Sequence, residues 1–124
     1  MTMASAMADT TTVMLPEKVD SETSAGVEAM IFAALRPGIG VIVDGSQVAY
    51  MSAAGVRTFA RSLHRAQEHG ARIVFCRFAG AAADCLLVSG FSQLFDVVDT
   101  VEDAARKLRS TPAGDRLHRR GGAG

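Results

Sequence analysis

The sequence first suggests the chemistry of a thiol. Cys76 ends the apolar stretch "ARIVFC" and begins the loop "CRFAGAAAD", so a thiolate at the end of a strand could attack a phosphate held by the following turn. Such a site needs a cation, usually an arginine that closes the same loop, to stabilise the thiolate and bind the oxyanion. Here the sixth residue after the cysteine is Ala82, and the only cation of the loop is Arg77. We therefore interpret Cys76, like Cys85 on the following helix, as a small apolar side chain. A thiol enzyme is the least favoured alternative.

Other catalytic and cofactor patterns are missing. The sequence contains neither a G-x-x-x-x-G-K-[ST] loop nor a G-x-G-x-x-G fingerprint after its first predicted strand. His64, His69 and His118 do not stand with a serine or cysteine and an acid in a catalytic pattern. The two cysteines have no metal-ligand spacing and no disulfide framework, which is typical of a reduced, cytoplasmic chain. We therefore expect no catalytic residue, no metal, no cofactor and no small-molecule substrate.

A run of small residues, "YMSAAGV", stands where a predicted strand gives way to a predicted helix. It covers residues 50–56 and follows the apolar run "VIVDGSQVA". Small side chains leave the first N–H groups of a helix open, so that a phosphate, a carboxylate or a partner's backbone can approach them. Tight packing is the alternative. Arg57, Arg61 and Arg65 form an i, i+4 row on this helix, which is either a solvated face or a surface that steers an acidic partner.

Composition limits the size and the class of the protein. With 124 residues and 48% hydrophobic content, the chain is long enough for one compact domain but not for two. Its formal net charge is zero, which argues against a nucleic-acid binder that follows phosphates with excess lysine and arginine. The longest apolar run, residues 29–35, is too short to cross a bilayer. We expect a soluble, cytoplasmic domain without membrane insertion.

The hydrophobic pattern predicts four strands that alternate with four helices. This order implies an α/β fold, with a mainly parallel sheet of four to five strands and about four helices packed against it. Two helices show apolar faces, one at Val27, Met30, Ile31, Ala34 and Leu35, and the other at Val56, Phe59, Leu63 and Ala66. The predicted strands are residues 10–15, 39–44, 71–76 and 93–99, and the predicted helices begin near Ser21 or Ser24, Ala53, Ala81 and Val101.

The two ends of the chain differ from its middle. Residues 1–9 are predicted to be a flexible leader. From residue 110 onward, "STPAGDRLHRRGGAG" has a proline, four glycines and no apolar period, so we expect a disordered, mildly basic tail. Thr100 and Asp103 form a pattern similar to a capping box at the start of the last helix. The predicted domain therefore covers residues 10–109.

This layout resembles the STAS domain family of bacterial anti-sigma factor antagonists. The resemblance covers about residues 10–109 and is carried by "VIVDGSQVAYMSAAGVRTFARSLHRAQEHGARIVF" and "LLVSGFSQLFDVVDTVEDAARKL". In that family, a strand that ends in aspartate leads through a short apolar segment into Asp-Ser-Ser-Gly at the start of a long helix. The second serine is phosphorylated by the partner kinase. The resemblance implies a STAS-like α/β sandwich and a role in partner switching.

The family motif can be carried onto this chain residue by residue. Asp44 matches the strand-end acid, and Val48, Tyr50 and Met51 match the apolar lead-in. Ser52 falls at the aspartate of the motif, Ala53 at its first serine, Ala54 at its phosphorylated serine and Gly55 at its glycine, while residues 89–91 match a small-Gly-apolar turn.

The departure at Ala54 has a direct chemical consequence. Alanine has no hydroxyl, so phosphorylation at the usual position is impossible, and Ser52 is the only hydroxyl left in the motif. We expect Ser52 to cap the helix through its side chain, which would protect it from a kinase. The chain is then a constitutive binding module or one that is controlled elsewhere.

The resemblance predicts a non-catalytic module for protein–protein contact. Its partner would be an anti-sigma factor or a related serine-kinase-fold switch protein, and its role the regulation of transcription. The alternative is a STAS subunit of an ABC-type lipid transport complex, whose partner would be an ATPase subunit. The expected partner-binding residues lie at the small-residue junction and in two neighbouring turns: Asp20, Ser21, Asp44, Ser46, Ser52, Ala53, Ala54, Gly55 and Arg57.

Overall fold

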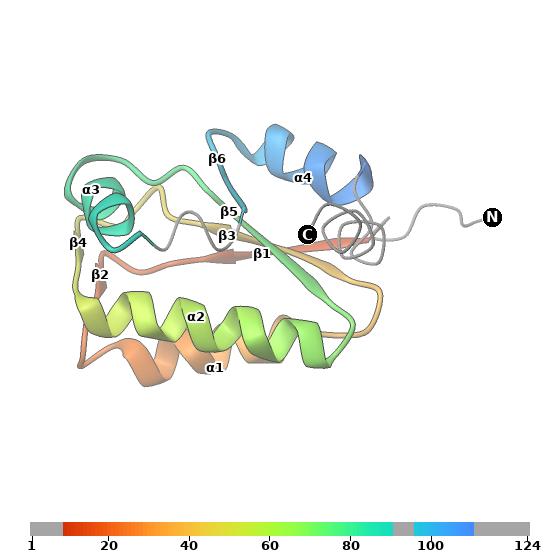
Figure 1. Cartoon of the computed structure of the whole chain (residues 1–124), viewed down its shortest axis with the longest axis horizontal. Coiled ribbons are helices and arrows are strands. Elements are labelled where there is room, and N and C mark those ends of the chain that lie inside the picture. Colours follow the sequence, from red (N-terminus) through yellow and green to blue (C-terminus); the bar gives the residue numbers. More distant parts are fainter. Residues whose placement is uncertain (1–8, 91–95, 111–124) are drawn as a thin grey trace.

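The computed structural model describes residues 9–90 and 96–110 of the chain (Figure 1). It contains four helices and a four-stranded parallel sheet, which confirms the predicted α/β class. Along the chain, the elements are β1 (Thr10–Met14), β2 (Lys18–Val19), α1 (Ser24–Ala34), β3 (Gly40–Asp44), β4 (Tyr50–Met51), α2 (Ala53–Glu68), β5 (Arg72–Cys76), α3 (Gly80–Val88), β6 (Asp96–Val98) and α4 (Val101–Ser110).

The main sheet has the order β1-β3-β5-β6, and every neighbouring pair is parallel. All residues of β3 and β5 are buried, as the apolar residues at the centres of both strands predict for strands covered on both faces. Helices α1 and α2 lie side by side on one face, and α4 lies on the other (Figure 1). Successive strand residues point to opposite faces, so Val41 and Ile73 join the core under α1 and α2, whereas Ile42 and Val74 join the core under α4.

A second, two-stranded sheet was not predicted from the sequence. β2 and β4 pair in parallel, with Lys18 opposite Tyr50 and Val19 opposite Met51. Each strand has only two residues, too few for an alternating pattern to be recognised. This small sheet fixes the path of the chain from β3 into α2.

The predicted helices are present, but both apolar faces are turned slightly from their predicted directions. Met30 was expected in the core and is 41% exposed, because α1 lies over the edge strand β1 and only Val27, Ile31 and Leu35 face the sheet. On α2, the predicted stripe is correct at its centre, but the buried surface also includes two hydroxyl residues. Phe59 and Ala66 are buried and Val56 and Leu63 half-buried, while Thr58 and Ser62 are buried as well.

Helix starts were predicted with mixed success. Neither Ser21 nor Ser24 is the N-cap of α1: that position belongs to Thr23, and Ser24 Oγ instead donates a hydrogen bond to the carbonyl of Asp20. At α4, the prediction is confirmed, because the N–H of Asp103 donates to Thr100 Oγ1 over 2.9 Å. Residues 1–8 of the predicted leader, the tail beyond residue 110 and the first part of the strand predicted over 93–99 lie outside the described residues, while Ser110, predicted to begin the tail, is the last residue of α4.

Candidate docking surface

The expected partner-binding residues gather at one end of the molecule, where the parallel strands finish. In Figure 1 this end lies on the left and carries β2, β4, α3 and the starts of α1 and α2. Loops at the carboxyl ends of parallel strands are the usual place for recognition in α/β folds. The small-residue junction and the two predicted turns lie at this end.

The start of α2 is held against the backbone of β2. The N–H of Ser52 donates to the carbonyl of Val19 over 3.0 Å, which continues the pairing of β2 with β4. A Cβ on Gly55 would stand 2.6 Å from that same carbonyl oxygen, closer than real contacts allow. Gly55 is therefore required by the close approach of helix and strand. It is buried and cannot itself contact a partner, whereas Ala53 is exposed and Ala54 half-buried.

The predicted cap by Ser52 is wrong. The residue occupies the N-cap position of α2 in an extended conformation, but its side chain makes no capping hydrogen bond. Its Oγ is buried and has no hydrogen-bond partner among the described residues. Burial, rather than a cap, closes this hydroxyl to solvent. The first turn of α2 contains no acidic side chain, so no carboxylate of the helix itself competes for its free N–H groups.

The turn after β2 is held by hydrogen bonds of its own side chains and follows the strand that pairs with β4. The Asp20 carboxylate accepts hydrogen bonds from the N–H groups of Glu22 and Thr23 over 3.0 and 3.1 Å. Thr23 Oγ1 in turn donates to the carbonyl of Lys18 over 2.9 Å. Because β2 and β4 are parallel, the residues that follow them lie at the same end of the small sheet. Ser21, in this turn, is exposed.

The turn after β3 depends on a buried carboxylate. Asp44 is 2% exposed, so the expectation that it contacts a partner is wrong. Its Oδ1 accepts the N–H of Ser46 over 2.8 Å, and its Oδ2 lies 3.7 Å from a guanidinium nitrogen of Arg77. Asp44 therefore shapes the turn from within. Ser46, at the tip, remains exposed.

Cys76 has the properties of a core residue. It is fully buried, and burial raises the pKa of its thiol from 9.0 to about 11, helped by the negative charge of Asp44 and opposed by the positive charge of Arg77. A nucleophilic cysteine needs a lowered pKa and access to substrate, and this one has neither. Within residues 9–90 and 96–110, no three His, Cys, Asp or Glu side chains are grouped so that they could hold a metal ion.

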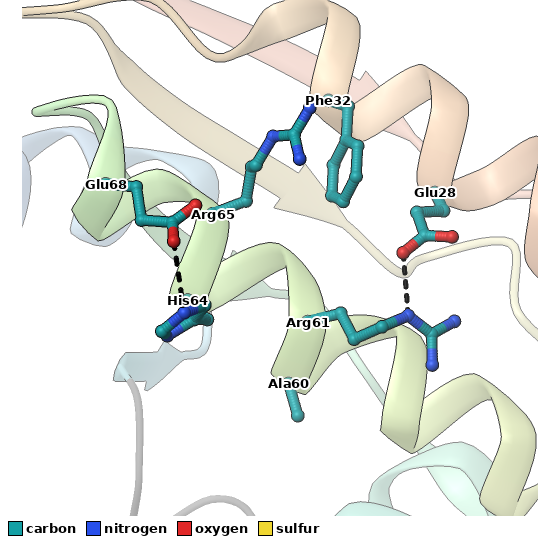
Figure 2. Close-up of a pocket in the computed structure, with 7 residues that line it drawn as sticks. All are labelled: Glu28, Phe32, Ala60, Arg61, His64, Arg65 and Glu68. Carbon is teal, nitrogen blue, oxygen red and sulfur yellow. Dashed lines mark hydrogen bonds and ion pairs between the residues drawn. The ribbon is translucent and has the colours of Figure 1, made fainter.

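Two members of the arginine row cross from α2 to α1 (Figure 2). Arg61 Nε lies 2.7 Å from a carboxylate oxygen of Glu28, and the guanidinium of Arg65 lies 4.7 Å from the ring centre of Phe32. Both flank an open groove of about 470 Å³ between the two helices. Arg57 makes no ion pair with any described residue, so it is the member of the row that remains available near the start of α2.

Sequence reasoning missed one exposed aromatic side chain of this end. Tyr50 in β4 is 51% exposed and immediately precedes Met51 and the small-residue junction. β4 has only two residues, so no alternating pattern marked this exposed side chain in advance. Leu87 and Val88, on α3 beside β4, are also exposed.

Comparisons with known proteins agree with this architecture. The family model described as STAS domain matches residues 4–104. An anti-sigma-factor antagonist (STAS) domain protein from Planctomyces limnophilus superposes with a TM-score of 0.71 at 15% identity, over 82% of this chain and 92% of that one. An anti-sigma factor antagonist from Mycobacterium paratuberculosis superposes with the same score, 0.71, at 21% identity, over 83% and 88%.

A transporter also contains a similar domain. The murine anion transporter Solute Carrier 26 family member A9 matches with a TM-score of 0.71 at 15% identity, over 84% of this chain but only 18% of the transporter. No helix in the described part of this chain has the length and apolar character needed to cross a membrane. A search of curated protein sequences found no relative. The family model, which matches most of the chain, shows that the protein belongs to the STAS domain family.

Proposed function

We propose that this chain is a non-catalytic, cytoplasmic binding module that regulates transcription by sequestering an anti-sigma factor or a related kinase-fold switch protein. The observation that carries the proposal is the start of α2, which β2 holds in place while Ala53 is left exposed and Ala54 half-buried. A partner's backbone or helix can approach the helix start closely at these two positions, because an alanine side chain is only a methyl group. Two solved structures with the same fold are described as anti-sigma factor antagonists.

The proposed contact surface is smaller than the set of residues first expected. Asp44 and Gly55 are buried and support the surface, whereas exposed residues of the junction and turns meet the partner. Asp20, Ser52 and Ala54 are half-buried and contribute mainly shape. The exposed members are Ser21, Ser46, Ala53 and Arg57, with Tyr50 added from the structure.

Control of this module differs from the usual family switch. Ala54 lacks the hydroxyl that receives phosphate in the family, and the burial of Ser52 Oγ argues against a substitute acceptor two residues earlier. A phosphate at this point would repel the partner through its charge and bulk. Binding is therefore proposed to be constitutive with respect to phosphorylation of the motif.

The test requires the partner, which affinity capture from the native cell followed by mass spectrometry would identify. Titration calorimetry with the purified partner then compares the parent chain with Ala54→Glu. A charged, bulky side chain at the contact should weaken the complex by about 2 kcal/mol, or roughly thirty-fold in Kd. Gln67→Glu is the matched control, because it adds the same charge to the exposed far end of α2, about 20 Å away. Equal binding of Ala54→Glu and the parent chain would refute the docking surface.

A STAS subunit of an ABC-type lipid transport complex is the second candidate. The match to the murine transporter favours it only to the extent that a STAS domain can be part of a transport protein. The same capture experiment distinguishes the two candidates. A kinase-fold regulator among the captured proteins supports the first, and an ATPase subunit with a permease supports the second.

A further inference from the structure

The outer face of α2 carries a row of positive charge. Residues 53–65 contain Arg57, Arg61 and Arg65 and no acidic residue, and all three arginines are exposed. Because they stand four residues apart, they share one face of the helix. The partial positive charge of the helix N-terminus lies at the same end as Arg57. This arginine row therefore runs from the proposed docking surface along α2.

The three arginines differ in their partners. Arg61 binds Glu28 of α1 over 2.7 Å. Arg57 and Arg65 make no ion pair with any residue in 9–90 or 96–110. Of the 13 acidic residues of the chain, only Asp115 lies outside these ranges, so the sequence holds almost no further side-chain carboxylate for them. Two of the three guanidinium groups are therefore suited to an acid of another protein.

Arg65 is also oriented by a neighbouring helix. Its guanidinium lies 4.7 Å from the centre of the Phe32 ring on α1. Such a cation–π contact orients the guanidinium while its N–H donors can still bind a carboxylate. A side chain that is oriented before binding loses less conformational entropy when it binds. Arg65 is therefore suited to a bidentate ion pair with a carboxylate.

A groove lies beside Arg65, between α1 and α2 (Figure 2). Its volume of about 470 Å³ lies within the usual range of binding pockets, about 300–1,000 Å³. Phe32 and Ala60 are half-buried and supply its apolar surface. Two ion pairs stand on opposite sides of this surface: Arg61 with Glu28, and His64 with Glu68. An apolar surface between charged side chains is suited to an amphipathic helix.

We propose that the partner lays an acidic amphipathic helix along α2, with carboxylates on Arg57 and Arg65 and an apolar side chain in the groove. The two arginines are eight residues apart in sequence, which corresponds to about 12 Å along the helix axis. Acids about two turns apart on the partner helix match this spacing. The inference rests on the proposed function, because the same partner contacts the start of α2. It adds the chemistry that this partner must present.

Two synthetic helical peptides test the proposal without the partner. Both have the same length and the same stripe of leucines, and their other faces carry glutamates in one peptide and lysines in the other. In a fluorescence-anisotropy titration with the full chain, the glutamate peptide should bind with a Kd below about 1 mM. It should bind at least about ten-fold more tightly than the lysine peptide, because only its charges complement the arginine row.

Variants of the chain place the bound peptide. Arg57→Gln and Arg65→Gln should each weaken binding of the glutamate peptide by about three-fold or more, since each removes a partner of a carboxylate. Glu28→Gln should strengthen binding by about two-fold, because it releases Arg61 from its ion pair. Arg109→Gln is the matched control and should bind like the parent chain. It removes the same charge from an exposed position of α4, on the other face of the sheet.

Three results would overturn the proposal. Equal binding of the two peptides would show that charge does not select the partner helix. Absence of binding by the glutamate peptide up to about 1 mM would mean that the arginine row is only a solvated face. Binding that withstands both arginine substitutions would use a different surface. Circular dichroism checks that each variant folds.

The purified partner separates a failure of this inference from a failure of the proposed function. If Ala54→Glu weakens the complex and Arg65→Gln does not, the start of α2 docks the partner but the arginine row does not, which overturns this inference alone. If Arg65→Gln weakens the complex and Ala54→Glu does not, the arginine row binds the partner and the proposed docking at the start of α2 is wrong.

Discussion

Two helices of this protein begin with nearly the same sequence. α1 starts with "SAGV" at residues 24–27, and "SAAGV" at residues 52–56 leads into α2. At α1, Ser24 Oγ donates to the carbonyl of Asp20, and the space around Gly26 is open. At α2, Ser52 Oγ has no partner among the described residues, and Gly55 is pressed against Val19.

This difference shows that the same residue types can perform different tasks in different surroundings. The start of α1 is organised by local hydrogen bonds within one turn, as the contacts of Asp20 with Glu22 and Thr23 show. The start of α2 is organised by tertiary packing on the backbone of β2. A surface fixed in this way loses little conformational entropy when a partner binds, which favours the second start for docking.

The largest expected effect on stability comes from replacing the glycine at each of the two helix starts, Gly55 and Gly26, by alanine. Gly55→Ala should destabilise the fold by about 1–3 kcal/mol, because the new Cβ meets the Val19 carbonyl and the backbone must shift. Gly26→Ala should instead stabilise it by up to about 1 kcal/mol, since nothing lies within 4 Å and alanine is the better helix former. Urea unfolding measures both. Equal changes in the free energy of unfolding would remove the distinction between the two starts.

Cys76, at the end of β5, makes the stability of the fold depend on pH. The pKa of Cys76 is raised to about 11 by burial, so the unfolded chain ionises its thiol at lower pH than the folded chain does. The stability that this group contributes is complete below about pH 9 and is lost as the pH rises toward 11, by about 3 kcal/mol. Unfolding of the parent chain and of Cys76→Ala across this window isolates the effect. Parallel pH profiles for the two chains would show that Cys76 does not contribute.

The smallest expected effect concerns the two serines. Ser24→Ala should cost about 1 kcal/mol, because it removes a hydrogen bond to the carbonyl of Asp20. Ser52→Ala should be neutral or slightly stabilising, because it replaces a buried hydroxyl without a partner in the described structure by a methyl group. Thermal melts of both variants give the comparison. A clear loss of stability in Ser52→Ala would mean that its hydroxyl has a partner after all.

Much of the fold could be predicted from the sequence, because buried parallel strands and long helices have strong periodic signals. The apolar runs that became β3 and β5, and the stripe around Phe59, depend on many residues at once. Met30 was misplaced because its exposure depends on where α1 lies across the sheet. Local periodicity does not contain that information.

The candidate site was harder to predict, because its details depend on single contacts across the chain. The ion pair of Asp44 with Arg77 and the close approach of Gly55 to Val19 both join residues that lie far apart in sequence. The pairing of β2 with β4 involves two residues on each side and leaves almost no pattern. The small side chains of Ala53 and Ala54 and the two neighbouring turns were evident in advance, but the contacts that hold them were not.

The central claim is that the start of α2 docks a partner and lacks the usual phosphate acceptor. Its most direct test restores that acceptor with Ala54→Ser and follows partner binding with and without ATP, once the partner and its kinase activity are in hand. We expect the complex of the parent chain to be insensitive to ATP, and Ala54→Ser to take up one phosphate at residue 54 and to release the partner. The account would be contradicted if ATP released the parent chain from the partner, or if the phosphorylated Ala54→Ser chain stayed bound to the partner.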